Sequence, residues 1–194
     1  MGKKFTSRSL KLQGNKAEKA VSTILHSLGN AYHVYDNVII KTKNGTTQID
    51  HIVISIYGVF VIETKSHKGL IFGDCNSKNW TQVLYSKTGC FKYQFYSPFL
   101  QNYGHLKNLY KLFNLDYRYF LGLIVFTSGS VNLTNVNCSC VVHISSLYNT
   151  IMMYRKQLFT NEQVNHLQGV LEKNNCQSTY FDRKHIKYVK SIKN

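Results

Sequence analysis

Acidic residues, proline and long apolar runs are all scarce in this sequence of 194 residues. The only proline is Pro98, and no low-complexity linker or internal repeat is present, so no boundary between domains is indicated. The longest apolar run, over residues 119–126, is too short to cross a bilayer, and the first residues include no apolar signal-peptide core. We therefore expect one globular domain without a transmembrane segment.

The cysteines also lack a recognisable pattern, since five of them occur without any C-x-x-C pair. An odd set with this spacing indicates neither a disulfide framework nor a structural zinc site. Cys138, Cys140 and His143 could supply three metal ligands, although a buried pair of thiols on a strand is the favoured interpretation. Reduced cysteines and a cytoplasmic protein are expected.

Only nine Asp and Glu oppose 24 Lys and Arg, which gives a formal net charge of +15 at pH 7. This excess exceeds what solubility requires and favours a polyanionic partner, with nucleic acid first and an anionic membrane surface second. The basic residues are densest near the two ends, where they either contact phosphate or are simply solvated. The predicted organisation is a basic leader over 1–13, a single domain over 14–173 and a basic tail over 174–194.

Hydrophobic periodicity predicts a mixed α/β protein with helices layered against a sheet. Helices are expected over 15–29, 98–113, 146–157 and after Thr160, and strands over 37–42, 46–55, 58–66, 118–127 and 140–145. The turn-rich segment 69–96 is expected to form short strands or a flap. In the second helix, Phe99, Tyr103, Leu106, Leu109, Tyr110 and Phe113 form the expected apolar stripe, whereas Gln101, His105 and Asn108 share a polar face.

Three charged residues interrupt the otherwise apolar stretch 49–65, namely Asp50, Glu63 and Lys65. If residues 56–57 form a two-residue turn with Ser55 opposite Gly58, Asp50 stands opposite Glu63, and Lys65 shares their face. Directly opposed Cβ atoms are about 5 Å apart, so the two carboxylates repel each other unless a cation or a proton lies between them. A one-residue slip of register would place Asp50 on the opposite face.

This arrangement of charges suits phosphodiester hydrolysis. Two carboxylates from adjacent strands can ligate one Mg²⁺ while substrate phosphate and waters complete its shell. Lys65, one strand step beyond Glu63, can orient the attacking water or offset the charge of the phosphate. The alternative is a buried ion cluster of Asp50, Lys65 and Glu63 that only stabilises the hairpin.

The same residues carry a family resemblance. Asp50, twelve further residues and then Glu63-Thr64-Lys65 resemble the D…(D/E)-x-K signature of the PD-(D/E)xK nuclease superfamily. The surrounding segments are similar to the nuclease-related domain (NERD) family over roughly 14–113: "GNKAEKAV", "TTQIDHIVIS", "GVFVIETKSHKGLIFG", Trp80 with Gln82, and "SPFLQNYGHL". The resemblance implies a restriction-endonuclease-like α/β core of order αβββαβ, with a mixed central sheet flanked by helices.

The resemblance also implies roles for particular residues. It assigns Glu18 as the acid of the first helix, Asp50 and Glu63 as ligands of Mg²⁺ or Mn²⁺, Lys65 as the catalytic lysine, and Gln101 as a glutamine close to the active site. The proline that often precedes the motif's aspartate is replaced by Ile49, at a position that varies across the superfamily.

Several neighbouring residues have two interpretations. Glu18 could instead cap its helix or pair with Lys3 or Lys19 at the surface. His51 should face the other side of the sheet from Asp50, as a hydrogen-bonded core histidine rather than a ligand. His67 and Lys68 are placed to contact phosphate, or are simply exposed in a loop. The aromatic and lysine residues of 85–96 could stack on bases, although most aromatic residues are core residues.

Two classes of function follow from these patterns. The first is a metal-dependent nuclease acting on DNA, which includes a junction resolvase working as a homodimer. The second is a noncatalytic module that binds nucleic acid or docks a partner while retaining the nuclease fold. The sequence has no G-x-x-x-x-G-K-[ST] motif, so a helicase or ATPase partner would have to open strands if the reaction requires it.

Overall fold

The computed structural model describes residues 7–176, and side chains from residue 11 onward. Residues 1–6 of the predicted leader and all but the first three residues of the predicted basic tail therefore lie outside the described residues. The helices are α1 (Ser7–His26), α2 (Pro98–Phe113), α3 (Leu147–Met152) and α4 (Asn161–Asn174), with 3₁₀ turns at Tyr117–Tyr119 and Ile144–Ser146. The strands are β1 (Tyr32–Thr42), β2 (Gly45–Ser55), β3 (Gly58–Lys65), β4 (Gly69–Asp74), β5 (Asn79–Ser86), β6 (Gly89–Tyr96), β7 (Phe120–Phe126), β8 (Val131–Asn137) and β9 (Val141–His143).

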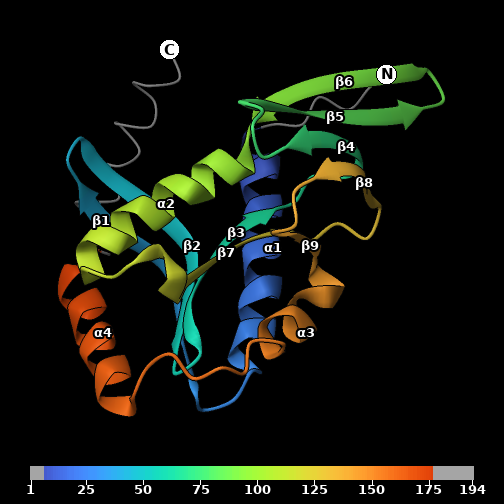
Figure 1. The fold of residues 1–194 in the computed structure, drawn as a ribbon. Helices are drawn as coiled ribbons and strands as arrows, with labels where there is room; N and C mark the ends of the chain where they lie inside the picture. Colours follow the sequence, from blue (N-terminus) through green and yellow to red (C-terminus); the bar gives the residue numbers. More distant parts are fainter. Residues whose placement is uncertain (1–6, 177–194) are drawn as a thin grey trace.

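The strands form two mixed sheets (Figure 1). In the first, of order β1-β2-β3-β7-β9, the first three strands are antiparallel, and β7 runs parallel to both β3 and β9. The second has the order β6-β5-β4-β8 and joins β4 to β8 in parallel. The segment expected as short strands or a flap therefore supplies three strands of this second sheet. The predicted mixed α/β class is confirmed, and the arrangement is compatible with a restriction-endonuclease-like core.

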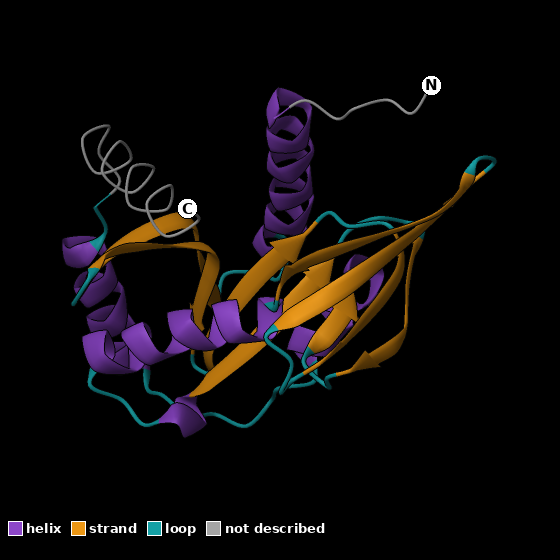
Figure 2. Ribbon diagram, turned by 90° about the horizontal axis from the view of Figure 1, so that it is seen from above, coloured by secondary structure: helices purple, strands orange, loops and turns teal. Residues whose placement is uncertain are grey.

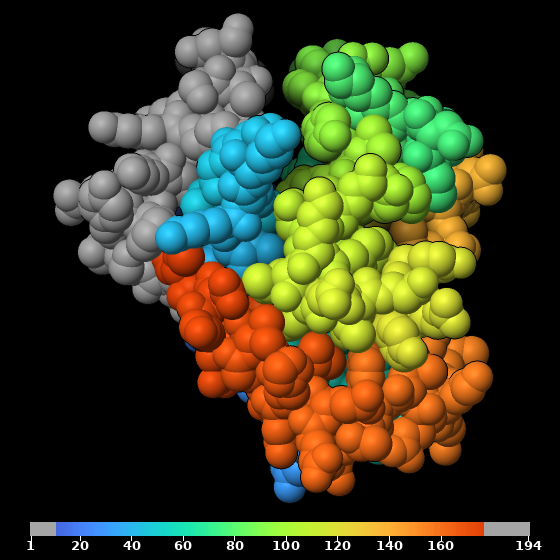
Figure 3. Space-filling view, turned by 60° about the vertical axis from the view of Figure 1, so that its left-hand side comes forward, coloured from blue at the N-terminus to red at the C-terminus, as the bar shows by residue number. Residues whose placement is uncertain are grey.

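Helices cover both faces of the first sheet, which makes the main body three layers thick. On one face, Val21 and Leu25 of α1 pack against Phe60 and Ile62 of β3, with α3 beside them. On the other, α2 and α4 lie side by side and cover the apolar residues of β1, β2 and β3 (Figure 3). Full burial of each large apolar side chain contributes about 1.5–3 kcal/mol, so this packing supplies most of the favourable free energy of folding.

Helix α1 begins at Ser7, well before the expected start near residue 15. The apolar stripe of the sequence indicates only the part of the helix that packs on the sheet, which starts at the buried Ala17. The first turns of the helix project beyond the sheet, where Leu12 is exposed, although Gln13 Nε2 still donates to the carbonyl oxygen of Ser66 at 3.0 Å (Figure 2). The described helix therefore includes part of the segment predicted as a leader.

The prediction of which side chains of α2 face the sheet is wrong in part. Tyr103 is 43% exposed, whereas Asn102 and His105 are buried against the sheet. The cause is a pair of hydrogen bonds from Asn102 Nδ2 to the carbonyl oxygens of Val61 (3.0 Å) and Leu123 (3.1 Å). Gly122 allows this close approach, because a Cβ there would lie 3.2 Å from Asn102 Nδ2 and closer still to the Leu106 side chain.

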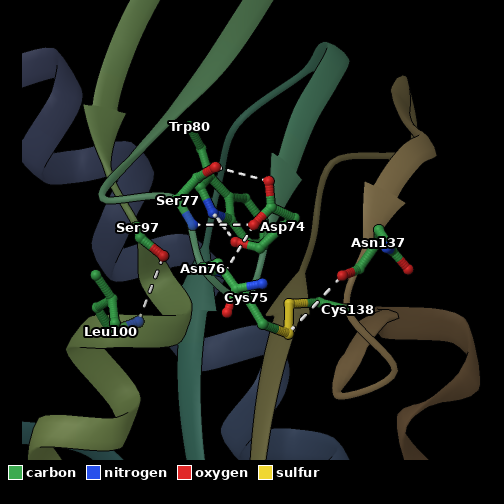
Figure 4. The surroundings of a disulfide bond; sticks show 9 residues. All are labelled: Asp74, Cys75, Asn76, Ser77, Trp80, Ser97, Leu100, Asn137 and Cys138. Atoms are coloured by element: carbon green, nitrogen blue, oxygen red, sulfur yellow. Dashed lines mark hydrogen bonds between the residues drawn. A yellow bond between two sulfur atoms is a disulfide. The ribbon is translucent and has the colours of Figure 1, made fainter.

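The expectation that all cysteines are reduced is also wrong. Cys75 and Cys138 form a disulfide, and their Cα atoms are 5.6 Å apart (Figure 4). The two residues directly follow Asp74 and Asn137, which are partners in the parallel pairing of β4 with β8. This pairing brings together cysteines 63 residues apart, and sequence spacing gives no sign of it.

The disulfide has two consequences for the earlier expectations. Cys138 is no longer available to a metal site with Cys140 and His143. The cytoplasmic location was expected because the thiols were expected to be reduced, and Cys75 and Cys138 do not meet that expectation. Cys90, Cys140 and Cys176 are free. Within residues 7–176, no helix has the length and apolar character needed to cross a membrane.

Candidate active site

The predicted register of the central hairpin is confirmed. Its cross-strand pairs run from Ser55 opposite Gly58 to His51 opposite Ile62. Beyond this last pair, Asp50 Oδ2 accepts a hydrogen bond from the backbone N–H of Thr64, at 2.8 Å. Asp50 therefore lies at the same end of the hairpin as Glu63.

A bend in the β1–β2 ribbon places Asp50 at this end. Asn37 has a φ of 55°, a left-handed conformation that asparagine tolerates better than most residues. The cross-strand pairing of β1 with β2 skips Asn37 and Asp50 at this point. Past the bend, Ile49 joins the same core cluster as Ile52, although simple alternation would put the two on opposite faces. Asp50 thus stands where the strand changes the face that it buries.

Glu63 is the centre of the site and is only 2% exposed. Lys65 Nζ donates to Glu63 Oε1 at 2.6 Å, and His105 Nε2 lies 3.3 Å from Oε2, at ion-pair distance but without the alignment of a hydrogen bond. Lys65 Nζ also donates to Gln101 Oε1 at 3.0 Å. The structure therefore brings β3 and one face of α2 together around this carboxylate.

His105 is a site residue that sequence reasoning missed. Its Nδ1 lies 3.0 Å from Thr47 Oγ1, and its Nε2 faces Glu63, so the ring bridges β2 and β3. The signal was its spacing from Gln101, because residues four apart on a helix share a face. That face had been interpreted only as polar, not as buried against the hairpin.

The pKa values of the two carboxylates of the hairpin, Asp50 and Glu63, are shifted in opposite directions. Burial alone would raise the pKa of Glu63, but the positive charge of Lys65 and the contacts with His105 outweigh it and lower that pKa. Burial, and then repulsion from Glu63, hold the pKa of Asp50 well above its usual range. Asp50 forms no ion pair with another described residue, so its charge calls for a proton or an added cation.

Glu18 approaches from α1, on the other side of the sheet. It is in mid-helix, so it does not cap α1. Its pKa is raised by burial, with His51 opposing that shift and Glu63 adding to it. Glu18 also lines a cleft of about 360 Å³ together with Asp36 and His51. The predicted acid of the first helix is therefore in electrostatic contact with Glu63 without sharing its face.

His51 is a buried, hydrogen-bonded core histidine, as predicted. Its Nδ1 lies 2.6 Å from Asp36 Oδ1, and Ser22 Oγ donates to Asp36 Oδ2 at 2.7 Å. Burial would raise the pKa of Asp36, but these hydrogen bonds outweigh it and lower that pKa. The contacts join α1 to the first two strands beside Glu18.

His67 and Lys68 follow β3 in a short loop. The ring of His67 stacks on Phe95 with 4.1 Å between ring centroids, and burial, helped by Lys65, lowers its pKa to about 4. A neutral imidazole offers phosphate a hydrogen bond but no charge. Lys68 is exposed, and its carbonyl oxygen accepts a hydrogen bond from Gln82 Nε2 at 2.7 Å.

The buried His67 should make stability depend on pH. Because its folded pKa of about 4 lies below the ordinary 6.5, its contribution is complete above pH 6.5 and is lost as pH falls toward 4. A shift of this size corresponds to about 3 kcal/mol. Urea unfolding at neutral and acid pH should show wild type losing about 2–3 kcal/mol more than His67→Phe, which keeps an aromatic ring.

The matched control is His166→Gln, at an exposed histidine of α4. It should follow the pH dependence of wild type. An NMR titration of His67 with a midpoint near 6.5 would contradict this account of the pH dependence.

A divalent cation is compatible with the donors at Asp50 and Glu63. Across residues 7–176, no three His, Cys, Asp or Glu side chains gather as a ready-made metal cage. Mg²⁺, however, is commonly held by one or two carboxylates, with waters and substrate phosphate completing its shell. Among the described residues, Lys65 pairs with Glu63 and no residue forms an ion pair with Asp50.

Comparison with known proteins found a similar sequence and a solved structure. The chain is 34% identical over 183 residues to an uncharacterized protein of Bacillus anthracis, pXO1-01, covering 92% of this chain and 84% of that protein. Among solved structures, SfsA of Pyrococcus furiosus in complex with Ca²⁺ is 18% identical with a TM-score of 0.29; the match covers 86% of this chain and 54% of SfsA. Residues 13–127 match the nuclease-related domain family. The chain, including its Asp50, Glu63 and Lys65 hairpin, belongs to the nuclease-related domain family.

Proposed function

We propose that the protein is a metal-dependent nuclease that hydrolyses phosphodiester bonds of DNA. Asp50 and Glu63 would hold Mg²⁺ or Mn²⁺, and Lys65 would assist the attacking water. The observation that carries the proposal is the convergence of two acids and one lysine at the end of a single hairpin, with Glu63 buried and Asp50 half-buried.

The ion, when bound, supplies positive charge beside the scissile phosphate. Every other contribution comes from the chain. An ammonium group has three donors, and Lys65 uses two of them on Glu63 Oε1 and Gln101 Oε1. The third can donate to the attacking water or to a phosphate oxygen. Gln101 and Glu63 therefore fix the direction of that remaining N–H.

His105 is a positioning residue in this scheme. It contacts the Glu63 oxygen that Lys65 does not use, so both oxygens of the buried carboxylate face positive or hydrogen-bonding groups. Glu63 is thereby kept ionised, and its side chain is held in one orientation. Glu18, on the far side of the sheet edge, adds negative charge that favours a cation nearby.

The purely structural alternative accounts for only part of this geometry. An ion cluster that stabilises the hairpin would include the contact between Lys65 and Glu63, which is present. It would also use Asp50, yet the hydrogen bond described for that carboxylate comes from a backbone amide. The uncompensated charge of Asp50 favours a cation-binding role over a structural one.

A noncatalytic DNA-binding module is the second candidate function, and the net charge of +15 is the observation that supports it. It predicts DNA binding that weakens steeply with salt, because released counterions dominate such binding. The complete set of Asp50, Glu63 and Lys65 favours the nuclease. A junction resolvase would also cleave, but only branched DNA and as a homodimer.

Cleavage of plasmid DNA by the purified protein tests the proposal. We expect nicking or degradation with Mg²⁺ or Mn²⁺ and none with a chelator. Glu63→Gln should lower the rate about a thousandfold, since losing several kcal/mol of charge stabilisation has an effect of that size. Asp116→Asn, at an exposed acid, is the control and should cleave as wild type does. Salt-sensitive binding without cleavage in either metal would establish the noncatalytic module instead.

A further inference from the structure

The hairpin of β5 and β6 carries a row of aromatic side chains on one face. Phe91, Tyr93 and Phe95 occupy alternate positions of β6, and their cross-strand partners are Leu84, Gln82 and Trp80 respectively. Alternate residues of a strand point to the same face and are about 7 Å apart. We refer to Phe91, Tyr93 and Phe95 as the aromatic row.

The aromatic row runs from the protein interior out into solvent. At its inner end, Phe95 packs against the buried Trp80 and stacks on His67. Tyr93 is 52% exposed and Phe91 is 45% exposed, on an edge strand whose hairpin extends beyond the rest of the fold (Figure 2). Exposed aromatic residues on a free sheet edge are an aggregation hazard unless they have a binding role.

The inner end of the aromatic row adjoins the candidate active site. His67 lies only two residues beyond Lys65, and its ring contacts Phe95. Gln82, on the same face as Tyr93, donates to the carbonyl oxygen of Lys68 at 2.7 Å. A ligand lying along the row would therefore lead toward Lys65.

The charge around the row suits a polyanion. No acidic residue occurs in the sequence between Asp74 and Asp116, whereas that span includes five lysines: Lys78, Lys87, Lys92, Lys107 and Lys111. Lys87 is exposed in the turn at the tip of the hairpin, whereas Lys92, between Phe91 and Tyr93 on β6, is exposed on the opposite face. Phosphates running along the hairpin would meet positive charge and no carboxylate from this segment.

We propose that the aromatic row binds single-stranded DNA by stacking and leads the strand to Lys65, an inference that rests on the proposed nuclease function. Bases in a duplex already stack on one another, so side chains of this kind bind unpaired bases. Rings about 7 Å apart can also admit one base between them, since aromatic faces touch at about 3.5 Å. The proposed ligand is an unpaired DNA strand, not a duplex.

The test is equilibrium binding of labelled oligothymidine in the presence of a chelator, measured by fluorescence anisotropy. Stacking contributes about 1–3 kcal/mol per base, so replacing both Phe91 and Tyr93 with alanine should weaken binding at least about 30-fold. Tyr85→Ala is the matched control, because Tyr85 is 73% exposed on the other face of the same hairpin. It should change the affinity by no more than about twofold.

Salt dependence separates stacking from charge. The double alanine variant should keep the salt slope of wild type, whereas Lys87→Ala, at the tip of the hairpin, should reduce it by about 0.7. The proposal is overturned if the double variant binds as wild type does, if Tyr85→Ala weakens binding equally, or if a duplex of the same length binds as tightly as the single strand.

Because the binding assay needs no metal, its outcome is independent of cleavage. If wild type cleaves DNA and the double variant binds as tightly as wild type, the nuclease proposal is supported and the role of the aromatic row is contradicted. If wild type does not cleave and the double variant loses binding, the role of the aromatic row is supported and the nuclease proposal is contradicted. Thermal unfolding of the variants should match wild type, since both replaced side chains are exposed.

Discussion

Lys65→Met should reduce the rate of DNA cleavage by about a thousandfold or more while leaving DNA binding within about twofold. The substitution keeps the length of the side chain but removes the N–H groups bonded to Glu63 and Gln101, and the one left for water or phosphate. Since this donor acts mainly in the transition state, its loss should lower the single-turnover rate and not the affinity.

Lys111→Met provides the control for the loss of one positive charge. Lys111 is exposed on α2, ten residues beyond Gln101, and its replacement should change neither rate nor affinity beyond about twofold. Single-turnover cleavage and anisotropy measured on the same preparations separate the two effects. If Lys65→Met cleaves at the wild-type rate, Lys65 serves only the ion cluster of the hairpin.

Asp50→Asn should abolish cleavage and, in metal-free buffer near pH 7, raise the free energy of unfolding by about 1 kcal/mol or more. Asparagine keeps an oxygen that can accept from Thr64 N–H, but it removes a carboxylate whose folded pKa burial and Glu63 have raised. A raised folded pKa means that ionised Asp50 destabilises the fold above that pKa. The penalty disappears below the unfolded value of 3.8.

The pH and metal dependence of this variant make the prediction specific. The stability gained through Asp50→Asn should shrink toward zero as pH falls below about 4, where aspartate is protonated in both states. Saturating Mg²⁺ should stabilise wild type, by about 2.7 kcal/mol at one hundred times its dissociation constant, and should not stabilise the variant. Denaturant unfolding with and without Mg²⁺ measures both effects.

Asp116→Asn is the matched control here as well. Asp116 pairs with Arg118 at the surface, so its replacement should bring no gain in stability and no change in the response to Mg²⁺. Destabilisation by Asp50→Asn at pH 7 would instead identify Asp50 as a structural ion partner.

Local patterns were enough to predict the register of the hairpin. The short turn at residues 56–57 and the positive φ of Gly58 fix which residues face each other. With that register, Asp50, Glu63 and Lys65 had to lie at one end of the hairpin. The placement of Gln101 beside Lys65 was implied by the family resemblance, not by spacing.

Features that depend on distant contacts could not be predicted in the same way. The facing of α2 depends on Gly122, which belongs to a strand in a different part of the sequence and lets Asn102 reach the sheet backbone. The disulfide depends on β4 pairing in parallel with β8. The role of His105 required both the facing of α2 and the position of Thr47. In each case the deciding contact joins residues far apart in the chain.

The hydrogen bonds of Asn102 also have a consequence for dynamics. They attach α2 to the neighbouring parallel strands β3 and β7, at Val61 and Leu123, two residues before Glu63 on β3. We therefore expect the helix and strands to move as one unit, and the amides beneath Asn102 to exchange with solvent only on global unfolding. The positions of Lys65, Gln101 and His105 are thus set before a substrate arrives. For the proposed nuclease, we expect the DNA strand to adjust to a rigid site, rather than the site to assemble around the strand.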